Sequence, residues 1–214
     1  MIQITSSMYI GEHPGCNRGN LYILSNADSV RMYKNDRFIK EYRPEMSPYK
    51  HLKHGPILID DFIGDALEKN ERFRPKHAKE MADAMNIVAR GSLNHIPKRL
   101  YPTALKLTLL YHIDFAEVTK LYTKYIGDWG GTATVYRFDA IKNGKVIKSV
   151  TKEPVNGIRL QAEADHTNLT EHHSYDVALV RIRAVDAHGN VLPFYQEPVR
   201  ITAEGDIAII GPDT

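Results

Sequence analysis

Ten histidines occur in the sequence, and imidazole is the commonest side-chain ligand for metals in proteins. His51 and His54 lie three residues apart, which would place both on one face of a helix. A glycine–proline pair follows them directly, and the residue before a proline disfavours the helical conformation. His172 and His173 are adjacent, so in a strand they would point to opposite faces. The sequence therefore predicts no metal site and no metal cofactor.

Carboxylates and the single cysteine are the other reactive groups. Glycoside hydrolysis needs two carboxyl groups, one acting as acid and the other as nucleophile or base. The candidates Asp60, Asp61, Asp65 and Glu68 are close in sequence, but we expect them to cap the start of a helix and to favour its dipole. Cys16 follows a histidine by three residues, a pattern more typical of a turn with a small buried thiol than of a catalytic pair. We expect no catalytic and no cofactor-binding residue in this chain.

Trp129 is the one candidate for ligand binding. It is the only tryptophan, and glycines lie on both sides of it. An aromatic ring at such a position can stack on a sugar, or it can pack where helices meet a sheet. Both interpretations remain open at this stage, and Trp129 is the predicted carbohydrate contact.

Length and charge exclude several classes of protein. A chain of 214 residues is too short for a (β/α)₈ barrel of ~250 residues that carries any further domain. The 28 Lys and Arg against 26 Asp and Glu leave a net charge of +2, which favours neither nucleic acid nor an anionic membrane as a partner. No apolar stretch approaches the ~20 residues that span a bilayer, and the N-terminus lacks the pattern of a signal peptide. We expect a cytoplasmic protein, which a single cysteine also fits.

Residues 1–60 carry the pattern of short strands. The expected strands are 21–24, 30–34, 37–42 and 55–59. Asn35 and Asp36 separate the second from the third, and a two-residue polar turn of this kind predicts a β-hairpin.

Residues 61–126 change to a helical period of 3.6 residues. Pro75 suits the first position of a helix and Gly91 the position just past its end. Asp114 and Glu117 resemble a capping box at the start of another helix. The expected helices are 62–70, 75–90, 103–112 and 114–125.

Residues 130–214 return to the strand pattern. Asn143-Gly144 is the strongest hairpin signal, because both central positions of a type I′ turn need positive φ. The expected strands are 132–138, 146–147, 177–185, 199–203 and 207–210. Only 60 residues remain from Val155 onward, enough for about four or five strands where a complete immunoglobulin-like sandwich has ~7. We therefore expect the second domain to be incomplete, with an unpaired sheet edge.

Three of these segments carry motifs in a fixed order. Residues 21–35, LYILSNADSVRMYKN, follow a "strand, Ser-Asn-x-Asp, x-Val-x-Leu-x-x-Asn-Gly" pattern, except that Asp36 replaces the final glycine. Residues 136–147 form a hairpin segment, and residues 180–193 are similar to "Val-x-Asp-x-x-Gly-x-x-Val-Pro". In this order they resemble the region after the catalytic barrel in bacterial glycoside hydrolase family 2 proteins of the β-galactosidase type. The helical zone, ending at 121–131, resembles an insertion in one bacterial branch.

The resemblance implies a mainly β chain with two immunoglobulin-like parts. Residues 1–154 would form a β-sandwich with a helical insertion at about 61–127, and residues 155–214 a second, truncated domain. The catalytic glutamates of the family lie on the barrel, so the chain would be a non-catalytic C-terminal accessory region. The implied partners are the barrel and N-terminal domains of the parent enzyme, with carbohydrate or further copies of the chain as additional candidates. A carbohydrate-binding module and a bacterial surface adhesin remain as alternatives.

Overall fold

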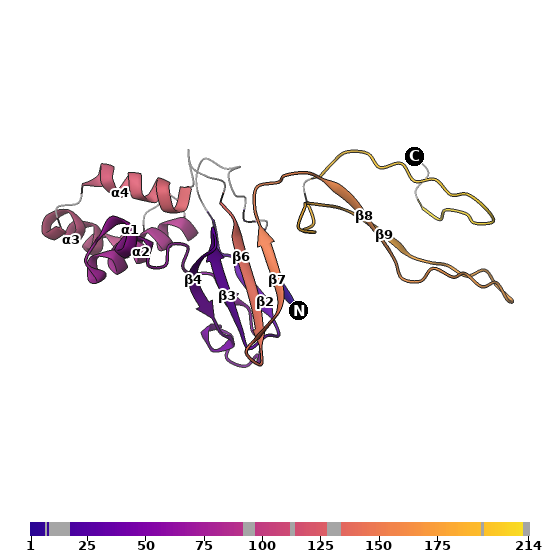
Figure 1. Ribbon diagram of the computed structural model, residues 1–214, viewed down its shortest axis with the longest axis horizontal. Coiled ribbons are helices and arrows are strands. Elements are labelled where there is room, and N and C mark those ends of the chain that lie inside the picture. Colours follow the sequence, from indigo (N-terminus) through magenta and orange to yellow (C-terminus); the bar gives the residue numbers. More distant parts are fainter. Residues whose placement is uncertain are drawn as a thin grey trace.

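The computed structural model describes residues 1–6, 8, 18–91, 97–111, 114–127, 134–193 and 195–211. In this part of the chain it contains nine strands in three antiparallel sheets and four α-helices, so the fold is mixed rather than mainly β. Figure 1 shows an elongated arrangement, with the helices at one end, two sheets in the middle and a third sheet at the other end.

The two central sheets fit a β-sandwich. The first has the order β1 (Ile2–Ile4), β2 (Tyr22–Ser25) and β5 (Ile57–Leu58). The second has the order β4 (Arg37–Tyr42), β3 (Ser29–Lys34), β6 (Tyr136–Lys142) and β7 (Lys145–Lys152). β3 pairs with β6, from Ser29 opposite Ile141 to Lys34 opposite Tyr136, so the helices are inserted between two adjacent strands.

Both predicted two-residue turns are confirmed. Asn35 and Asp36 join β3 to β4 with φ of 48° and 61°, and Asn143 and Gly144 join β6 to β7 with φ of 51° and 72°. Positive φ at both central positions matches the right-handed twist of the flanking strands. These local signals therefore determine two of the hairpins of the second sheet.

One apolar core joins the sandwich to the helices. Alternate residues of β3 and β6 point inward, and Met32, Tyr136 and Phe138 are fully buried. The same cluster includes Met81 of the helical region and Ile126. The helices consequently cover one end of the sandwich core and are not a separate unit.

The helices are α1 (Ala66–Glu71), α2 (Pro75–Arg90), α3 (Tyr101–Tyr111) and α4 (Phe115–Tyr122), with a π-turn, η3, at Thr123–Gly127. Single-turn 3₁₀ helices η1 (Pro44–Met46) and η2 (Lys98–Leu100) accompany them. The predicted boundaries of α2 are confirmed, with Pro75 at its first turn and Gly91 as C-cap. Asp114 caps α4 by accepting a hydrogen bond from the Glu117 backbone N–H at 2.6 Å.

Two helix boundaries differ from the prediction by three residues or more. Helix α1 begins at Ala66 and not at Phe62, because residues 62–64 form a turn that the Asp61 side chain holds. The helix predicted to continue to Tyr125 changes to the π-turn η3 after Tyr122. A π-helix is rare and usually a single turn long, so apolar periodicity over five residues does not distinguish it from an α-helix.

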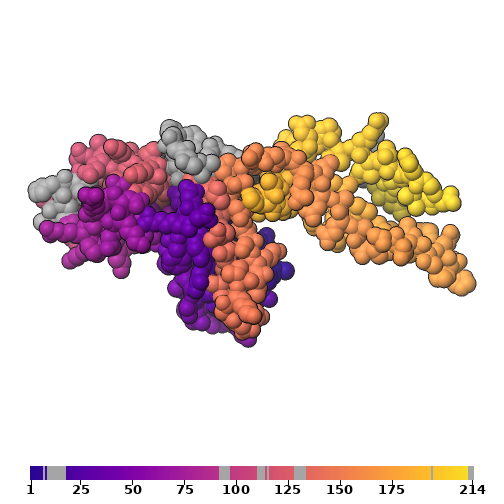
Figure 2. Space-filling view, viewed as in Figure 1, coloured from indigo at the N-terminus to yellow at the C-terminus, as the bar shows by residue number. Residues whose placement is uncertain are grey.

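The C-terminal residues depart furthest from the prediction. β8 (Arg159–Ala164) and β9 (Val180–Val185) pair with each other, so the strand predicted at 177–185 begins later. The segments 199–203 and 207–210, predicted as strands, form no ladder with the rest of the described chain. A strand needs a neighbour for its backbone hydrogen bonds, and apolar alternation does not supply one. Figure 2 shows this region, in orange and yellow, projecting from the body of the molecule.

Candidate functional site

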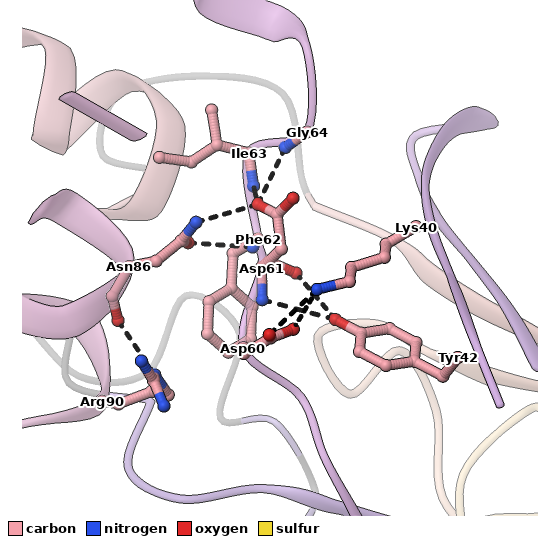
Figure 3. A network of polar contacts seen from close by, with 9 residues as sticks. All are labelled: Lys40, Tyr42, Asp60, Asp61, Phe62, Ile63, Gly64, Asn86 and Arg90. Carbon is pink, nitrogen blue, oxygen red and sulfur yellow. Dashed lines mark hydrogen bonds and ion pairs between the residues drawn. The ribbon is translucent and has the colours of Figure 1, made fainter. Parts of the chain in front are cut away.

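A network of polar side chains lies where α2 meets the sandwich (Figure 3). Asp61, in the segment after β5, is at its centre. One oxygen of its carboxylate, Oδ1, accepts hydrogen bonds from the backbone N–H groups of Ile63 and Gly64, both at 3.0 Å. The same oxygen accepts a third hydrogen bond from Nδ2 of Asn86, at 2.9 Å. Three donors from two elements therefore converge on one carboxylate.

Asn86 enters this network from the apolar face of α2. Asn86 is only 4% exposed, and it shares that face with Ala82 and Ala89. While Nδ2 donates to Asp61, Oδ1 accepts a hydrogen bond from the Phe62 backbone N–H at 3.0 Å. A buried amide needs partners for both its donor and its acceptor, and here both partners lie in the segment after β5.

Strand β4 contributes Lys40 and Tyr42. Lys40 Nζ contacts both carboxylate oxygens of Asp60, at 2.7 and 2.9 Å, and lies 5.4 Å from the centre of the Tyr42 ring. The Tyr42 hydroxyl accepts a hydrogen bond from the Asp61 backbone N–H at 3.3 Å and donates to its carbonyl oxygen at 3.4 Å. Burial raises the pKa of Tyr42, and the charges of Asp60 and Asp61 raise it further, so the hydroxyl stays protonated.

The geometry of this network suits a structural role, in which α2 is held to the segment after β5, better than acid–base catalysis. Glycoside hydrolysis requires a protonated carboxyl group beside a free carboxylate. Partial loss of solvent around its carboxyl group raises the pKa of Asp83 on α2. The residue as a whole is nevertheless exposed, so it does not provide a protonated acid in an enclosed site. Asp60 is paired with Lys40, and Asp61 accepts three hydrogen bonds. The network therefore holds α2 against the sandwich.

Four carboxylates were expected at a helix start, and the first, Asp60, pairs with Lys40 of β4 instead. Asp61 holds the turn before α1, and Glu68 lies in the first turn of α1, where a negative charge favours the helix dipole. Asp65 is the N-cap residue, but its side chain accepts no capping hydrogen bond. It pairs instead with Arg37 at 2.5 Å and Lys69 at 2.6 Å, so the capping prediction was wrong for Asp65.

The sequence interpretation did not identify Lys40, Tyr42 or Asn86 as members of a site. Asn86 carried a usable signal, because it is a polar residue at an apolar position of an otherwise amphipathic helix. Lys40 and Tyr42 carried none, since alternate polar residues are ordinary in a half-exposed strand.

A second cluster joins the end of α1 to the π-turn η3. Glu71 Oε1 accepts hydrogen bonds from Lys124 Nζ and from the Tyr125 hydroxyl, both at 2.6 Å. Asn70 Nδ2 donates to the same tyrosine oxygen at 3.3 Å. The hydrogen bonds from Lys124 and Tyr125 hold the pKa of Glu71 below its ordinary value.

We expect Glu71→Gln to lower the free energy of unfolding by about 1 kcal/mol at neutral pH. Because the folded pKa of Glu71 is lowered, its stabilising contribution is present above the ordinary glutamate pKa and is lost as the pH falls through the lowered one. The difference in the free energy of unfolding between wild type and variant should therefore shrink toward zero in acid. Urea unfolding over a pH series measures it, and Glu68→Gln, at an exposed position of the same helix, is the matched control. A difference that stays constant into acid would contradict this role of Glu71.

A cleft of about 430 Å³ lies between β1, β7 and the turn at 188–193. Asp186 shapes the turn by accepting hydrogen bonds from the backbone N–H groups of His188 and Asn190, at 2.9 and 2.8 Å. The side-chain amide of Asn190 donates from Nδ2 to the backbone carbonyl oxygen of Thr151 in β7, at 2.8 Å. Burial lowers the pKa of Lys152 at the same place. The described lining contains no Phe, Tyr or Trp, the rings on which sugars usually stack.

Of the residues singled out in the sequence, the two described histidine pairs lie in different parts of the fold. Trp129, the predicted carbohydrate contact, and Cys16 lie outside the described residues. The histidines at 51 and 54 lie between η1 and β5, whereas those at 172 and 173 lie between β8 and β9. The described ranges hold no group of three or more His, Cys, Asp or Glu side chains arranged for a metal ion. No helix in them is long and apolar enough to cross a membrane.

Comparison with known proteins gives one partial relationship. A stretch of 88 residues is 32% identical to a protein named beta-galactosidase from Rhizobium radiobacter. The match covers 40% of this chain and 62% of the relative, so the chain spans less than two thirds of that relative's length. No protein-family model matches the chain, and no solved structure matches it significantly. The chain thus contains a region similar in sequence to a glycoside hydrolase.

Proposed function

We propose that this chain is an accessory region of a β-galactosidase-like enzyme of glycoside hydrolase family 2, with a structural or assembly role. The observation that carries the proposal is the 88-residue similarity to a protein named beta-galactosidase. Since those 88 residues are 62% of the relative, the relative is about 140 residues long, whereas a catalytic barrel takes ~250. This length supports placing the shared region outside a barrel.

The proposed organisation has two immunoglobulin-like parts. Residues 1–154 would be a sandwich interrupted by the helical insertion at about 61–127, and residues 155–214 an incomplete second domain. The three- and four-stranded sheets and the β3–β6 pairing across the insertion support the first part. The two-stranded β8–β9 sheet supports the second, since such a hairpin is only marginally stable alone.

Surface exposure supports a role in assembly. Leu160, Ile182 and Ile201 belong to a long series of exposed apolar residues in the C-terminal region, with exposures of 51%, 37% and 56%. Contiguous exposed apolar surface marks a contact with another protein more often than a free face. The partners we propose are the barrel and N-terminal domains of the parent enzyme.

The purified chain should leave a chromogenic β-galactoside uncleaved, at the rate of buffer alone, because its best-placed carboxylates are bound to structural partners. A complete β-galactosidase in the same assay is the positive control. Cleavage above the buffer rate that survives repurification would contradict the accessory role.

A genetic experiment tests the other half of the proposal. Sequencing the coding DNA on both sides of this region should reveal a barrel-encoding segment, in the same reading frame or in the adjoining one. If the barrel is on a separate chain, adding the present chain should raise its activity on the chromogenic substrate. Neighbouring DNA without any barrel would overturn the proposal.

A further inference from the structure

The β8–β9 hairpin has one wholly apolar face. In its register Leu160 lies opposite Ala184, and Ala162 lies opposite Ile182. Leu160, Ala162 and Ile182 are nevertheless exposed, and Ala184 is half-buried. Two strands alone do not bury enough surface to be stable in water, so the hairpin is an element that needs a neighbour.

The outer edge of β9 already has a partner at its C-terminal end. Val185 forms a β-bridge with Val191, and the Leu192 backbone N–H donates to the Ala184 carbonyl oxygen at 2.9 Å. The outer edge of β8 has no ladder within the described residues. A new strand would therefore find the whole edge open on β8, whereas on β9 it would meet the segment already bound at Ala184 and Val185.

The hydrogen-bond pattern shows which groups β8 presents at this edge. The Asp165 N–H donates to the Leu179 carbonyl oxygen at 3.1 Å, so the backbone groups of the odd-numbered residues point toward β9. The backbone N–H and C=O groups of the even-numbered residues of β8 point away from β9, toward the outer edge. The free donors and acceptors consequently belong to Leu160, Ala162 and Ala164.

We propose that β8 pairs with β8 of a second copy of this chain, antiparallel and centred on Gln161. In this register Arg159 of each copy lies opposite Glu163 of the other, and Leu160 lies opposite Ala162. The residues with outward groups form the hydrogen-bonded pairs. The Arg159–Glu163 pairs are non-hydrogen-bonded ones, in which side chains approach closest. The two hairpins become one four-stranded sheet, whether or not the chain belongs to a glycoside hydrolase.

Charge distinguishes this edge from those of β9 and β7. The same two-fold pairing of β9, centred on Ile182, would put Arg181 opposite Arg183, and like charges opposite one another are destabilising. β7, one of the two edges of the larger sheet, has lysines at 145, 148 and 152, which discourage strand addition. β8 has no lysine and no proline. Its Glu163 already contacts Arg183 of its own chain at 3.1 Å and would lie between two guanidinium groups in the dimer.

Sedimentation equilibrium of the whole chain tests the proposal, and we expect a concentration-dependent dimer. Glu163→Arg and Arg159→Glu each place like charges opposite one another at two positions, so each should weaken dimerisation by about tenfold or more. The double variant restores opposite charges at both positions and keeps the net charge of the wild type, so it should dimerise more tightly than either single variant. It should stay weaker than the wild type, because position 163 then repels Arg183 of its own chain. Arg200→Glu, at an exposed position outside β8, is the matched charge control and should have no effect.

Amide hydrogen exchange of the wild type gives an independent reading that needs no variant. The N–H groups of Leu160, Ala162 and Ala164 should exchange more slowly as the protein concentration rises. A chain that stays monomeric up to its solubility limit would overturn the proposal, as would a dimer that tolerates both charge reversals. Protection of these amides in a monomer would also overturn it, because another strand would then occupy the edge.

Discussion

Replacing Asp61 with alanine should lower the free energy of unfolding by about 3 kcal/mol, because one carboxylate oxygen satisfies three donors. Two of these donors are the backbone N–H groups of Ile63 and Gly64, and the third is the buried amide of Asn86. Without the carboxylate the turn before α1 loses its support, and the Asn86 amide loses one of its two partners. The residue is thus expected to matter for the position of two helices, although it belongs to neither.

Asp60 provides the control for this experiment. It is the adjacent aspartate, but its side chain is 43% exposed and its partner is the single ammonium group of Lys40. Asp60→Ala should cost under about 1 kcal/mol, the usual value of an exposed ion pair. Urea unfolding followed by circular dichroism measures both variants. Equal losses at the two positions would mean that the network around Asp61 does not support the fold.

A double-mutant cycle tests whether Asp61 and Asn86 act together. Each single alanine variant breaks their shared hydrogen bond, so the double variant should cost less than the sum of the two by about 0.5 kcal/mol or more. Additive losses would show that the two residues stabilise the protein independently.

The features that could be predicted from the sequence are governed by a few neighbouring residues. The turn at Asn35-Asp36, the start of α2 at Pro75 and the cap at Asp114 all follow from conformational preferences of the residues themselves. Each of these elements forms where the local pattern places it.

The features that could not be predicted depend on distant partners. Segments 199–203 and 207–210 alternate like strands, but alternation does not provide an adjacent strand to bond. The pairing of β3 with β6 joins residues about 100 positions apart, with the helices between them. The centre of the polar network combines Asp61 and Asn86, which are 25 residues apart and of ordinary type. Only the tertiary fold brings such residues together.

Phe62→Ala should be the most destabilising single truncation we consider, at about 3–5 kcal/mol. Phe62 is fully buried, and it belongs to the core cluster that the sandwich and the helices share. Its backbone N–H also donates to Asn86, so its side chain and its main chain are fixed at the same junction. Alanine leaves a cavity that the surrounding elements can close only by moving relative to one another. The loss should therefore be accompanied by faster hydrogen exchange in α2.

Phe38→Ala is the matched control, because it removes the same atoms from a ring that is 48% exposed on β4. Its ring contacts Tyr33 edge to face, and such a pair contributes about 0.5–1.5 kcal/mol, so a loss near that size is expected. Urea unfolding compares the two variants, and exchange in α2 should change only for Phe62→Ala. If Phe62→Ala lowered stability and left exchange in α2 as in the wild type, the sandwich and the helices would unfold separately, and the shared core would not be what joins them.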